Sequence, residues 1–183
     1  RDIVQEWVVL STCNRVEFYY VTKNNVKAQL FIRSALASFF AVEEAVIDRV
    51  FSCYEGEDVA RHLFEVSSGT QSLVFGEEEI LGQIKDAYAL AQSLSSTGPG
   101  LNKLFQSAIA VGKQVRDKTP ISVGAQSVSS VAVNVIHDQY SDPEFYDQSI
   151  LVIGAGIMAE RAIRKLRSLG HYRIKIVNRN RTR

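Results

Sequence analysis

The chain has 183 residues, of which 46% are hydrophobic and 22% charged, so it can bury a core and is globular. A formal net charge of +1 gives no strong footprint for a polyanion, so nucleic-acid contact is permitted by the charge but not indicated by it. Two cysteines, Cys13 and Cys53, are too few for a disulfide framework and match no metal-ligand spacing, which favours free thiols in a reducing compartment and implies no structural metal. The sequence has no apolar run that could cross a bilayer and no signal-peptide pattern.

Two apolar runs, at 7–10 and 16–21, predict a pair of strands with a polar turn between them. The turn has the sequence Ser-Thr-Cys-Asn-Arg at 11–15 and places the thiol of Cys13 beside a cation. A nearby positive charge and partial exposure raise the population of the thiolate, which is the reactive form of a nucleophilic cysteine. Cys13 could instead be a small buried residue that continues the first strand, as many free cysteines are. The polar neighbours of Cys13 favour the first interpretation, a nucleophilic cysteine.

The middle of the chain is predicted to be mostly helical. Helices are expected at 26–40, 58–66, 78–94, 101–115 and 128–136, and a short strand is expected at 51–54. Cys53 is interpreted as an ordinary residue of that strand. The three prolines, Pro99, Pro120 and Pro143, lie in segments that are expected to join elements. The first region is therefore a mixture of α and β, and its apolar stripes are expected to be core.

A glycine-rich turn follows a predicted buried strand at 149–153. Gly154 and Gly156 with the small Ala159 form a GxGxxA pattern, which lets backbone approach a pyrophosphate at the start of a helix. After the next predicted strand, at 173–177, the chain has arginine and asparagine where a fold selecting NAD places an acidic residue. This favours NADPH over NADH. A glycine turn followed by a solvated basic loop is the alternative.

One further helix and the start of the next hold candidate polar residues. His62 taken alone is more often a satisfied, partly buried histidine than a catalytic one. The acidic run at 77–79 opens a predicted helix, where carboxylates complement the helix dipole. Their combination with the thiol turn and the glycine turn favours a functional role.

These motifs together resemble the glutamyl-tRNA reductase family, whose NADPH-dependent enzymes begin tetrapyrrole synthesis from glutamate. The matching stretches are Ser11 to Glu17, His62 to Gln83, Lys113 to Arg116, Gly124 to Ala132 and Val152 to Met158. The first two are highly specific, whereas many oxidoreductases share the glycine motif.

The resemblance implies a reaction in two stages. Cys13 would attack the activated ester of glutamyl-tRNA, release the tRNA and hold a glutamyl thioester, which hydride from NADPH would reduce to glutamate-1-semialdehyde. His62 matches the activity-critical histidine of the family and would act as an acid or base. Arg15 could pair with a glutamate carboxylate.

The resemblance also implies the positions of binding residues. Substrate contacts would fall on Thr12, Asn14, Arg15, Ser72, Glu77, Glu78, Glu79 and Gln83. Contacts to NADPH would fall on Gly154, Ala155, Gly156, Ile157, Met158 and Ala159, with Asn178 and Arg179 after the following strand. The family often has glutamine at the place of Glu79, so an added negative charge there puts that contact in doubt.

The resemblance gives an α/β fold class with two parts. We expect an α+β catalytic domain that binds glutamyl-tRNA at 1–120, and at 121–183 a linker helix and the first βαβ part of a Rossmann-type NADPH domain. The chain is expected to be a fragment, because the family has a further strand upstream, and more of the cofactor domain and a helical dimerisation region downstream. The complete protein would be a homodimer that hands its semialdehyde to the next enzyme of the pathway. It would be cytoplasmic in a bacterium or archaeon and in the plastid stroma in a plant.

Two other classes of function stay open. A different NADP-linked dehydrogenase, acting on a small carbonyl compound, would explain the glycine turn but not the thiol turn. A non-catalytic relative that binds tRNA or a regulator would explain the helices, and its binding would not depend on Cys13.

Overall fold

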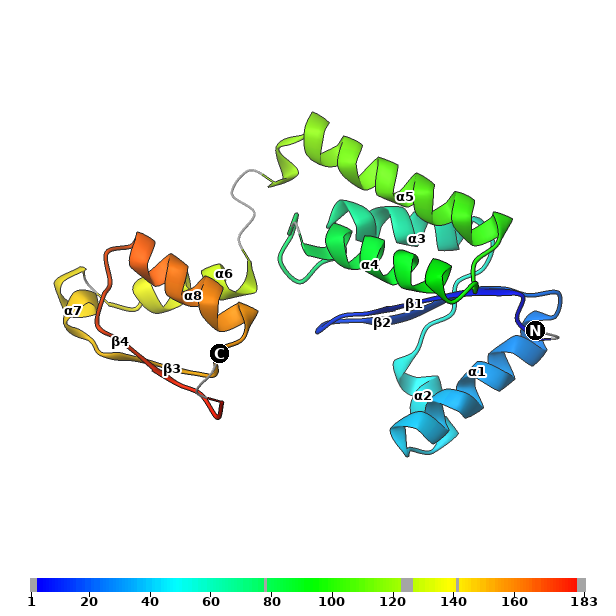
Figure 1. The fold of residues 1–183 in the computed structure, drawn as a ribbon, viewed down its shortest axis with the longest axis horizontal. Coiled ribbons are helices and arrows are strands. Elements are labelled where there is room, and N and C mark those ends of the chain that lie inside the picture. Colours follow the sequence, from blue (N-terminus) through cyan, green and yellow to red (C-terminus); the bar gives the residue numbers. More distant parts are fainter. Residues whose placement is uncertain (1–2, 78, 123–126, 141, 181–183) are drawn as a thin grey trace.

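The computed structural model describes residues 3–77, 79–122, 127–140 and 142–180, and its elements form two groups (Figure 1). The first group contains β1 (Glu6–Ser11), β2 (Val16–Val21), α1 (Asn25–Phe40), α2 (Glu44–Val50), α3 (Glu57–Ser68), α4 (Glu79–Ser93), α5 (Pro99–Lys118) and the 3-10 turn η1 (Pro120–Ser122). The second contains α6 (Val128–His137), α7 (Asp142–Asp147), β3 (Ile150–Ile153), α8 (Ile157–Ser168) and β4 (Ile174–Val177). The predicted α/β class is confirmed. No helix in the described part of the chain is long and apolar enough to span a membrane.

The first group is built around a two-stranded antiparallel hairpin. β1 and β2 pair with Trp7 opposite Tyr20 and Ser11 opposite Val16, as the two apolar runs predict. Helices α3, α4 and α5 lie on one face of this hairpin, and α1 and α2 lie on the other (Figure 1). Because side chains alternate between the faces of a strand, Val8 and Leu10 are fully buried toward the three helices.

The main core lies between the hairpin and α3–α5. Phe105 of α5 is fully buried, packs edge-on against Tyr19 of β2 at a centroid distance of 5.2 Å, and stacks on Tyr88 of α4 at 5.5 Å. Helices α3 and α5 cross so closely that a Cβ atom added to Gly112 would lie 2.6 Å from the carbonyl oxygen of Ser67. The face of the hairpin that carries Glu17 and Tyr19 is therefore covered by a closely packed layer of helices.

A smaller core lies on the other face of the hairpin, where Leu36 and Ile47 pack with Phe18. It includes α2, a short helix that the sequence analysis did not anticipate. Arg33 of α1 stabilises α2 through ion pairs with Glu44 (2.7 Å) and with Asp48 of the same helix (3.0 Å).

The strand expected at 51–54 is absent, so that prediction is wrong. Phe51 donates its N–H to the carbonyl of Ile47 at 3.0 Å and thereby caps α2, while Cys53 and Tyr54 are exposed. A strand needs a neighbour that accepts and donates backbone hydrogen bonds, and in the described residues no strand pairs with this segment. The expected junctions at Pro99 and Pro143 are first turns of helices, where proline is favoured.

The second group is a parallel β–α–β unit. β3 and β4 pair with Ile150 opposite Ile174, α8 connects them, and α6 and α8 lie on one face (Figure 1). The expectation that β3 is buried is wrong, because Leu151 is 55% and Ile153 81% exposed. Helices cover only one face of this small sheet in the described residues, so alternate side chains of β3 point to an uncovered face.

Candidate functional site

Cys13 lies at the tip of the β1–β2 hairpin. The N–H of Thr12 donates to the carbonyl of Arg15 at 2.9 Å, which leaves Cys13 and Asn14 as a two-residue loop. The hydroxyl of Thr12 accepts the N–H groups of Asn14 and Arg15, each at 3.1 Å, and so holds the loop in shape. Cys13 is exposed in this loop, so it is not a buried residue that continues the first strand. A thiol in this place is accessible to a large substrate.

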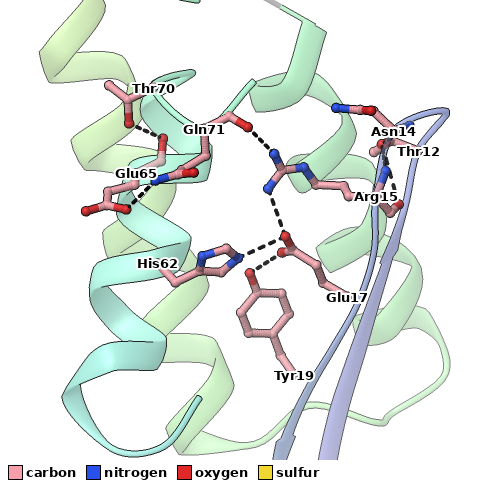
Figure 2. Close-up of polar contacts among 9 residues, drawn as sticks. All are labelled: Thr12, Asn14, Arg15, Glu17, Tyr19, His62, Glu65, Thr70 and Gln71. Carbon is pink, nitrogen blue, oxygen red and sulfur yellow. Dashed lines mark hydrogen bonds and ion pairs between the residues drawn. The ribbon is translucent and has the colours of Figure 1, made fainter. Parts of the chain in front are cut away.

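Three side chains converge on the carboxylate of Glu17, which lies on β2 two residues after Arg15 (Figure 2). Arg15 donates to Oε1 from Nη1 at 2.8 Å, and Tyr19 donates to Oε2 at 2.5 Å. His62 of α3 contacts Oε1 through Nε2 at 2.9 Å. Glu17 and Tyr19 share one face of β2, and Arg15, just before the strand, continues this alternation because the three residues are spaced by two. This arrangement, called here the Glu17 network, joins the hairpin to α3.

The Glu17 carboxylate is held in its ionised form. Burial by itself would raise the pKa of Glu17, but hydrogen bonds from His62 and Tyr19, together with the charges of His62 and Arg15, outweigh it and bring the pKa below its ordinary value. Burial, followed by the charge of Glu17, raises the pKa of Tyr19, so the phenol remains a neutral donor. An ionised acceptor beside Nε2 favours the tautomer of His62 that carries its proton on that nitrogen.

His62 is fixed from a second side by an aromatic ring. Tyr54 stacks on the imidazole with a centroid distance of 4.8 Å and an angle of 14° between the rings. The predicted catalytic histidine thus has both its orientation and one of its hydrogen bonds set by neighbours. It also lines, together with Glu17, one part of a cleft of about 970 Å³ between β2, α1 and the segment that carries Tyr54.

Arg15 is engaged with protein groups in the structure. Besides the bond to Glu17, its Nη2 donates to the carbonyl oxygen of Gln71, in the loop between α3 and α4. Contact between Arg15 and a substrate carboxylate, which the resemblance implies, requires that one of these donors be shared or released. That contact stays a prediction.

Ser72 and Glu77 lie in the loop between α3 and α4. Gly69 ends α3 with φ of +82°, and Gly76 has φ of +78° and donates its N–H to the carbonyl of Gly69 at 3.0 Å. The ends of this loop are therefore drawn together. The hydroxyl of Ser72 is buried and has no hydrogen-bond partner within the described residues.

The remaining predicted substrate residues lie on α4. Glu79 is in its first turn, where a carboxylate complements the helix dipole, and it forms an ion pair with Arg161 of α8. Gln83 follows four residues later on the same side of the helix and is half-buried. Glu78 lies outside the described residues, as do residues 124–126 of the matching stretch that begins at Gly124.

The structure adds residues to the site that the sequence analysis did not single out. Glu17 was within the matching thiol stretch but was given no role, although its spacing of two from Arg15 and from Tyr19 on a predicted strand already places the three side chains together. Tyr54 and Gln71 gave no such signal, because their partners are distant in sequence.

The glycine turn has the geometry that the motif predicts. Gly154 follows β3 with φ of +103°, a conformation that favours glycine, and Gly156 is the N-cap residue of α8. A Cβ atom added at either position would meet nothing within 4 Å, so the backbone is open to a ligand. The turn and the residues after β4 enclose a cavity of about 210 Å³, lined by Ala155, Gly156, Asn178, Arg179 and Asn180.

The remaining predicted cofactor residues, Ile157, Met158 and Ala159, form the first turn of α8. Its unpaired N–H groups therefore face the end of the sheet where the cavity lies. Arg179 is exposed there, and the residue before it, Asn178, donates to the carbonyl of Asn180 at 2.7 Å. These residues fit a phosphate-bearing dinucleotide. Among the described residues, no group of three or more histidine, cysteine or carboxylate side chains is placed to hold a metal ion.

Comparison with known proteins gives two family matches in the same order along the chain. Residues 1–119 match the N-terminal domain of glutamyl-tRNAGlu reductase, and residues 135–183 match the shikimate / quinate 5-dehydrogenase family. The second match indicates a dehydrogenase-type nucleotide-binding unit around the glycine turn.

Individual relatives agree with the first of these family matches. The chain is 40% identical over 183 residues to the glutamyl-tRNA reductase of Roseiflexus castenholzii, covering 100% of this chain and 43% of that protein. It is 42% identical over 178 residues to the enzyme of Chloroflexus aurantiacus, covering 97% of this chain and 40% of that protein. The solved structure of glutamyl-tRNA reductase from Methanopyrus kandleri aligns with a TM-score of 0.58 at 32% identity, over 97% of this chain and 41% of that one. The chain thus spans about two fifths of the length of these relatives.

Proposed function

This chain belongs to the glutamyl-tRNA reductase family, and from that premise we propose that the protein reduces glutamyl-tRNA to glutamate-1-semialdehyde with NADPH, the first committed step of tetrapyrrole synthesis. The observation that carries the proposal is the exposed Cys13 at a hairpin tip whose next residues lead into the Glu17 network. A nucleophile, a supported histidine and a set of polar side chains within one short stretch suit acyl transfer.

The first stage uses the thiol of Cys13. Its sulfur attacks the carbonyl carbon of the glutamyl ester, a C–S bond forms, and the C–O bond to the terminal ribose breaks. The ribose oxygen leaves with a proton, and the glutamyl group stays on Cys13 as a thioester. A thioester is reduced far more easily than a carboxylate, which is the chemical reason for forming the covalent intermediate before the reduction.

His62 is the group that we assign to proton transfer around the acyl carbon. Its Nε2 is directed at the ionised Glu17, which keeps the ring oriented. Glu17 and Tyr54 act on the ring and not on the substrate. We assign the contacts with the glutamyl group to Thr12, Asn14, Arg15, Ser72, Glu77, Glu78, Glu79 and Gln83.

The second stage needs a hydride donor near the glycine turn. We propose NADPH, bound by the backbone from Gly154 to Ala159 and by Asn178 and Arg179; when bound it supplies hydride to the thioester carbonyl. The guanidinium of Arg179 suits a 2′-phosphate, and no carboxylate occupies residues 178–180. Cys13 then serves as a thiolate leaving group when the aldehyde is released.

The two stages, acyl transfer at Cys13 and hydride transfer near the glycine turn, suggest how the whole protein is divided into domains. We propose that residues 1–120 form the unit that binds glutamyl-tRNA and that residues 121–183 begin the unit that binds NADPH. The protein would act as a homodimer and pass its reactive aldehyde to the next enzyme of the pathway. It would work in a reducing compartment, the cytoplasm of a bacterium or archaeon or the stroma of a plant plastid.

The deciding experiment is the intact mass of the chain after mixing with glutamyl-tRNA in the absence of NADPH. Cys53 supplies a matched control, because it is the other free thiol in the structure and is also exposed. We expect a glutamyl adduct on the parent chain and on the Cys53→Ser variant, and none on Cys13→Ser.

Two outcomes would contradict the proposal. An adduct that persists in Cys13→Ser would remove Cys13 from the nucleophile role. The absence of an adduct from a longer protein that contains this chain, when circular dichroism shows it to be folded, would argue against acyl transfer.

A further inference from the structure

The loop between α3 and α4, residues 69–77, is fastened at its base. Gly76 bonds to Gly69, and a Cβ atom added to Gly76 would lie 2.1 Å from the carbonyl oxygen of Ile121 in η1. The base of the loop is thus packed directly against the backbone that follows α5. Leu73 and Phe75, in contrast, are 72% and 64% exposed, so apolar packing does not hold the outer part of the loop.

Arg116, in the last turn of α5, reaches across to both ends of this loop. Its Nη1 donates to the carbonyl of Ser67 at 2.6 Å and to that of Gly112 at 2.8 Å, and its Nη2 donates to the carbonyl of Glu77 at 3.0 Å. Ser67 lies two residues before the loop and Glu77 is its last residue. One guanidinium therefore bridges the end of α3 to the end of the loop, through hydrogen bonds that are strengthened by its charge.

A second arginine contacts the middle of the loop. Arg15 donates from Nη2 to the carbonyl of Gln71, while its Nη1 is bonded to Glu17 (Figure 2). Arg15 belongs to the hairpin that presents Cys13. The position of Ser72, next to Gln71, therefore depends on the hairpin at one side and on Arg116 at the other.

We propose that Arg116 is a positioning residue that fixes the 69–77 loop so that Gln71 meets Arg15 and Ser72, to which we assign a substrate contact, is held beside it. The part of this inference that concerns substrate rests on the proposed function, whereas the part that concerns the loop does not. Close packing at Gly112 already joins α3 to α5. The bond from Arg116 to Glu77 is therefore not needed for that helix contact and acts on the loop.

Hydrogen exchange of the chain tests the loop directly. The variants are Arg116→Met, Arg116→Lys, and Lys113→Met as a control that removes an exposed positive charge from the same helix. In Arg116→Met we expect peptides covering residues 69–77 to exchange at least about tenfold faster, because bonds from a charged donor to several carbonyls are lost. Arg116→Lys should give a smaller increase, since an ammonium group lacks the planar fork. Peptides from α1 should not change, and the control should match the parent.

Two results would overturn the proposal at this stage. One is unchanged exchange in the 69–77 peptides of Arg116→Met. The other is an equal increase in every helix, which would show that Arg116 serves global stability only.

The rate of adduct formation on Cys13 tests the consequence for substrate. We expect Arg116→Met to lower the rate at saturating glutamyl-tRNA by about tenfold or more, with little change in the concentration that gives half saturation, because the loop orients the acyl group and not the tRNA body. If a longer, folded protein that contains this chain forms no adduct, while the loop loosens as expected in Arg116→Met, the proposed function fails and the holding of the loop stands. If the parent and Arg116→Met form adduct at the same rate, the positioning role fails.

Discussion

Glu17 illustrates at the scale of one residue how a partly buried charge can organise a site. Its two oxygens accept hydrogen bonds from Arg15, Tyr19 and His62, and its side chain is only 16% exposed. A carboxylate in that position would cost several kcal/mol if it were unpaired. The three donors offset that cost and, in return, each has its orientation set by the same acceptor.

The stability of the chain should depend on pH through Glu17. Its pKa in the folded chain lies below the ordinary value of 4.5, so the stabilisation is complete above about that pH and is lost as the pH falls through the folded pKa. We expect Glu17→Gln to lower the free energy of unfolding at pH 7 by about 2 kcal/mol and to flatten its dependence on pH below 4.5. Chemical denaturation at a series of pH values measures both effects. Asp86→Asn, a change at an exposed carboxyl, is the control, and equal slopes for the two variants would contradict the prediction.

Close helix packing is the main feature at the scale of elements. Helices α3 and α5 approach so closely at Gly112 that a methyl group has no room, whereas Gly82 in α4 has open space around it. The two glycines lie in neighbouring helices and have opposite surroundings. They therefore separate the effect of packing from that of intrinsic helix propensity.

Alanine substitution should act in opposite directions at these two glycines. We expect Gly112→Ala to destabilise the chain by about 1–3 kcal/mol through overpacking against Ser67, in spite of the better helix propensity of alanine. Gly82→Ala should stabilise it by up to about 1 kcal/mol. Thermal unfolding of both variants decides the matter, and a stabilising effect of Gly112→Ala would show that the helices can move apart at no cost.

In the second group, one histidine is buried without hydrogen-bond partners for its ring. His171 is 1% exposed, contacts Phe145 at a centroid distance of 4.9 Å, and has neither ring nitrogen hydrogen-bonded within the described residues. Buried polar atoms without partners cost about 1–3 kcal/mol. His171 follows Gly170, whose φ is +86°, and donates its backbone N–H to the carbonyl of Leu166 at the end of α8. An apolar side chain is expected at this place in a helix C-terminal motif.

Replacing His171 with leucine should therefore raise the stability of the second group. We expect a gain of about 1–2 kcal/mol at neutral pH for His171→Leu. Tyr172→Leu, at a neighbouring position that is 73% exposed, should change it by less than about 0.5 kcal/mol. Urea unfolding followed by circular dichroism gives both values. A loss of stability in His171→Leu would mean that the imidazole has a stabilising partner.

At the scale of the whole molecule, the buried side chains form separate clusters. The core around Phe105 lies among β1, β2 and α3–α5, and the core around Phe145 lies among α6–α8 and the second sheet. All pairs of elements in extensive contact belong to the same group within the described chain. The ion pair of Glu79 with Arg161 connects the groups, but an ion pair of this exposure contributes little to stability.

We therefore expect calorimetry to resolve two unfolding transitions. Phe105→Ala should lower the midpoint of one transition and Phe145→Ala that of the other, since removing a buried phenylalanine costs about 3–5 kcal/mol within its own core. A single transition that both substitutions shift equally would show that the groups unfold as one unit.

The local elements could be predicted because their signals are carried by neighbouring residues. The spacing of apolar side chains predicts α1, α3, α5 and α6, and the polar turn between two apolar runs predicts the hairpin with Cys13 at its tip. The glycine pattern predicts the turn between β3 and α8. These features depend on interactions within a few residues, so the sequence alone contains what is needed to find them.

Features that depend on residues far apart in the chain were decided by the tertiary structure. The residues at 51–54 have the composition of a strand but remain unpaired, because a strand exists only where another offers its hydrogen bonds. His62 is supported by Glu17, 45 residues earlier, and Arg116 reaches Glu77 and Ser67 from another helix. The sequence by itself determined which residue types and local turns are available for chemistry. Only the packing of helices on the hairpin determined which of them meet, because long-range contacts depend on the whole arrangement of elements and not on any one segment.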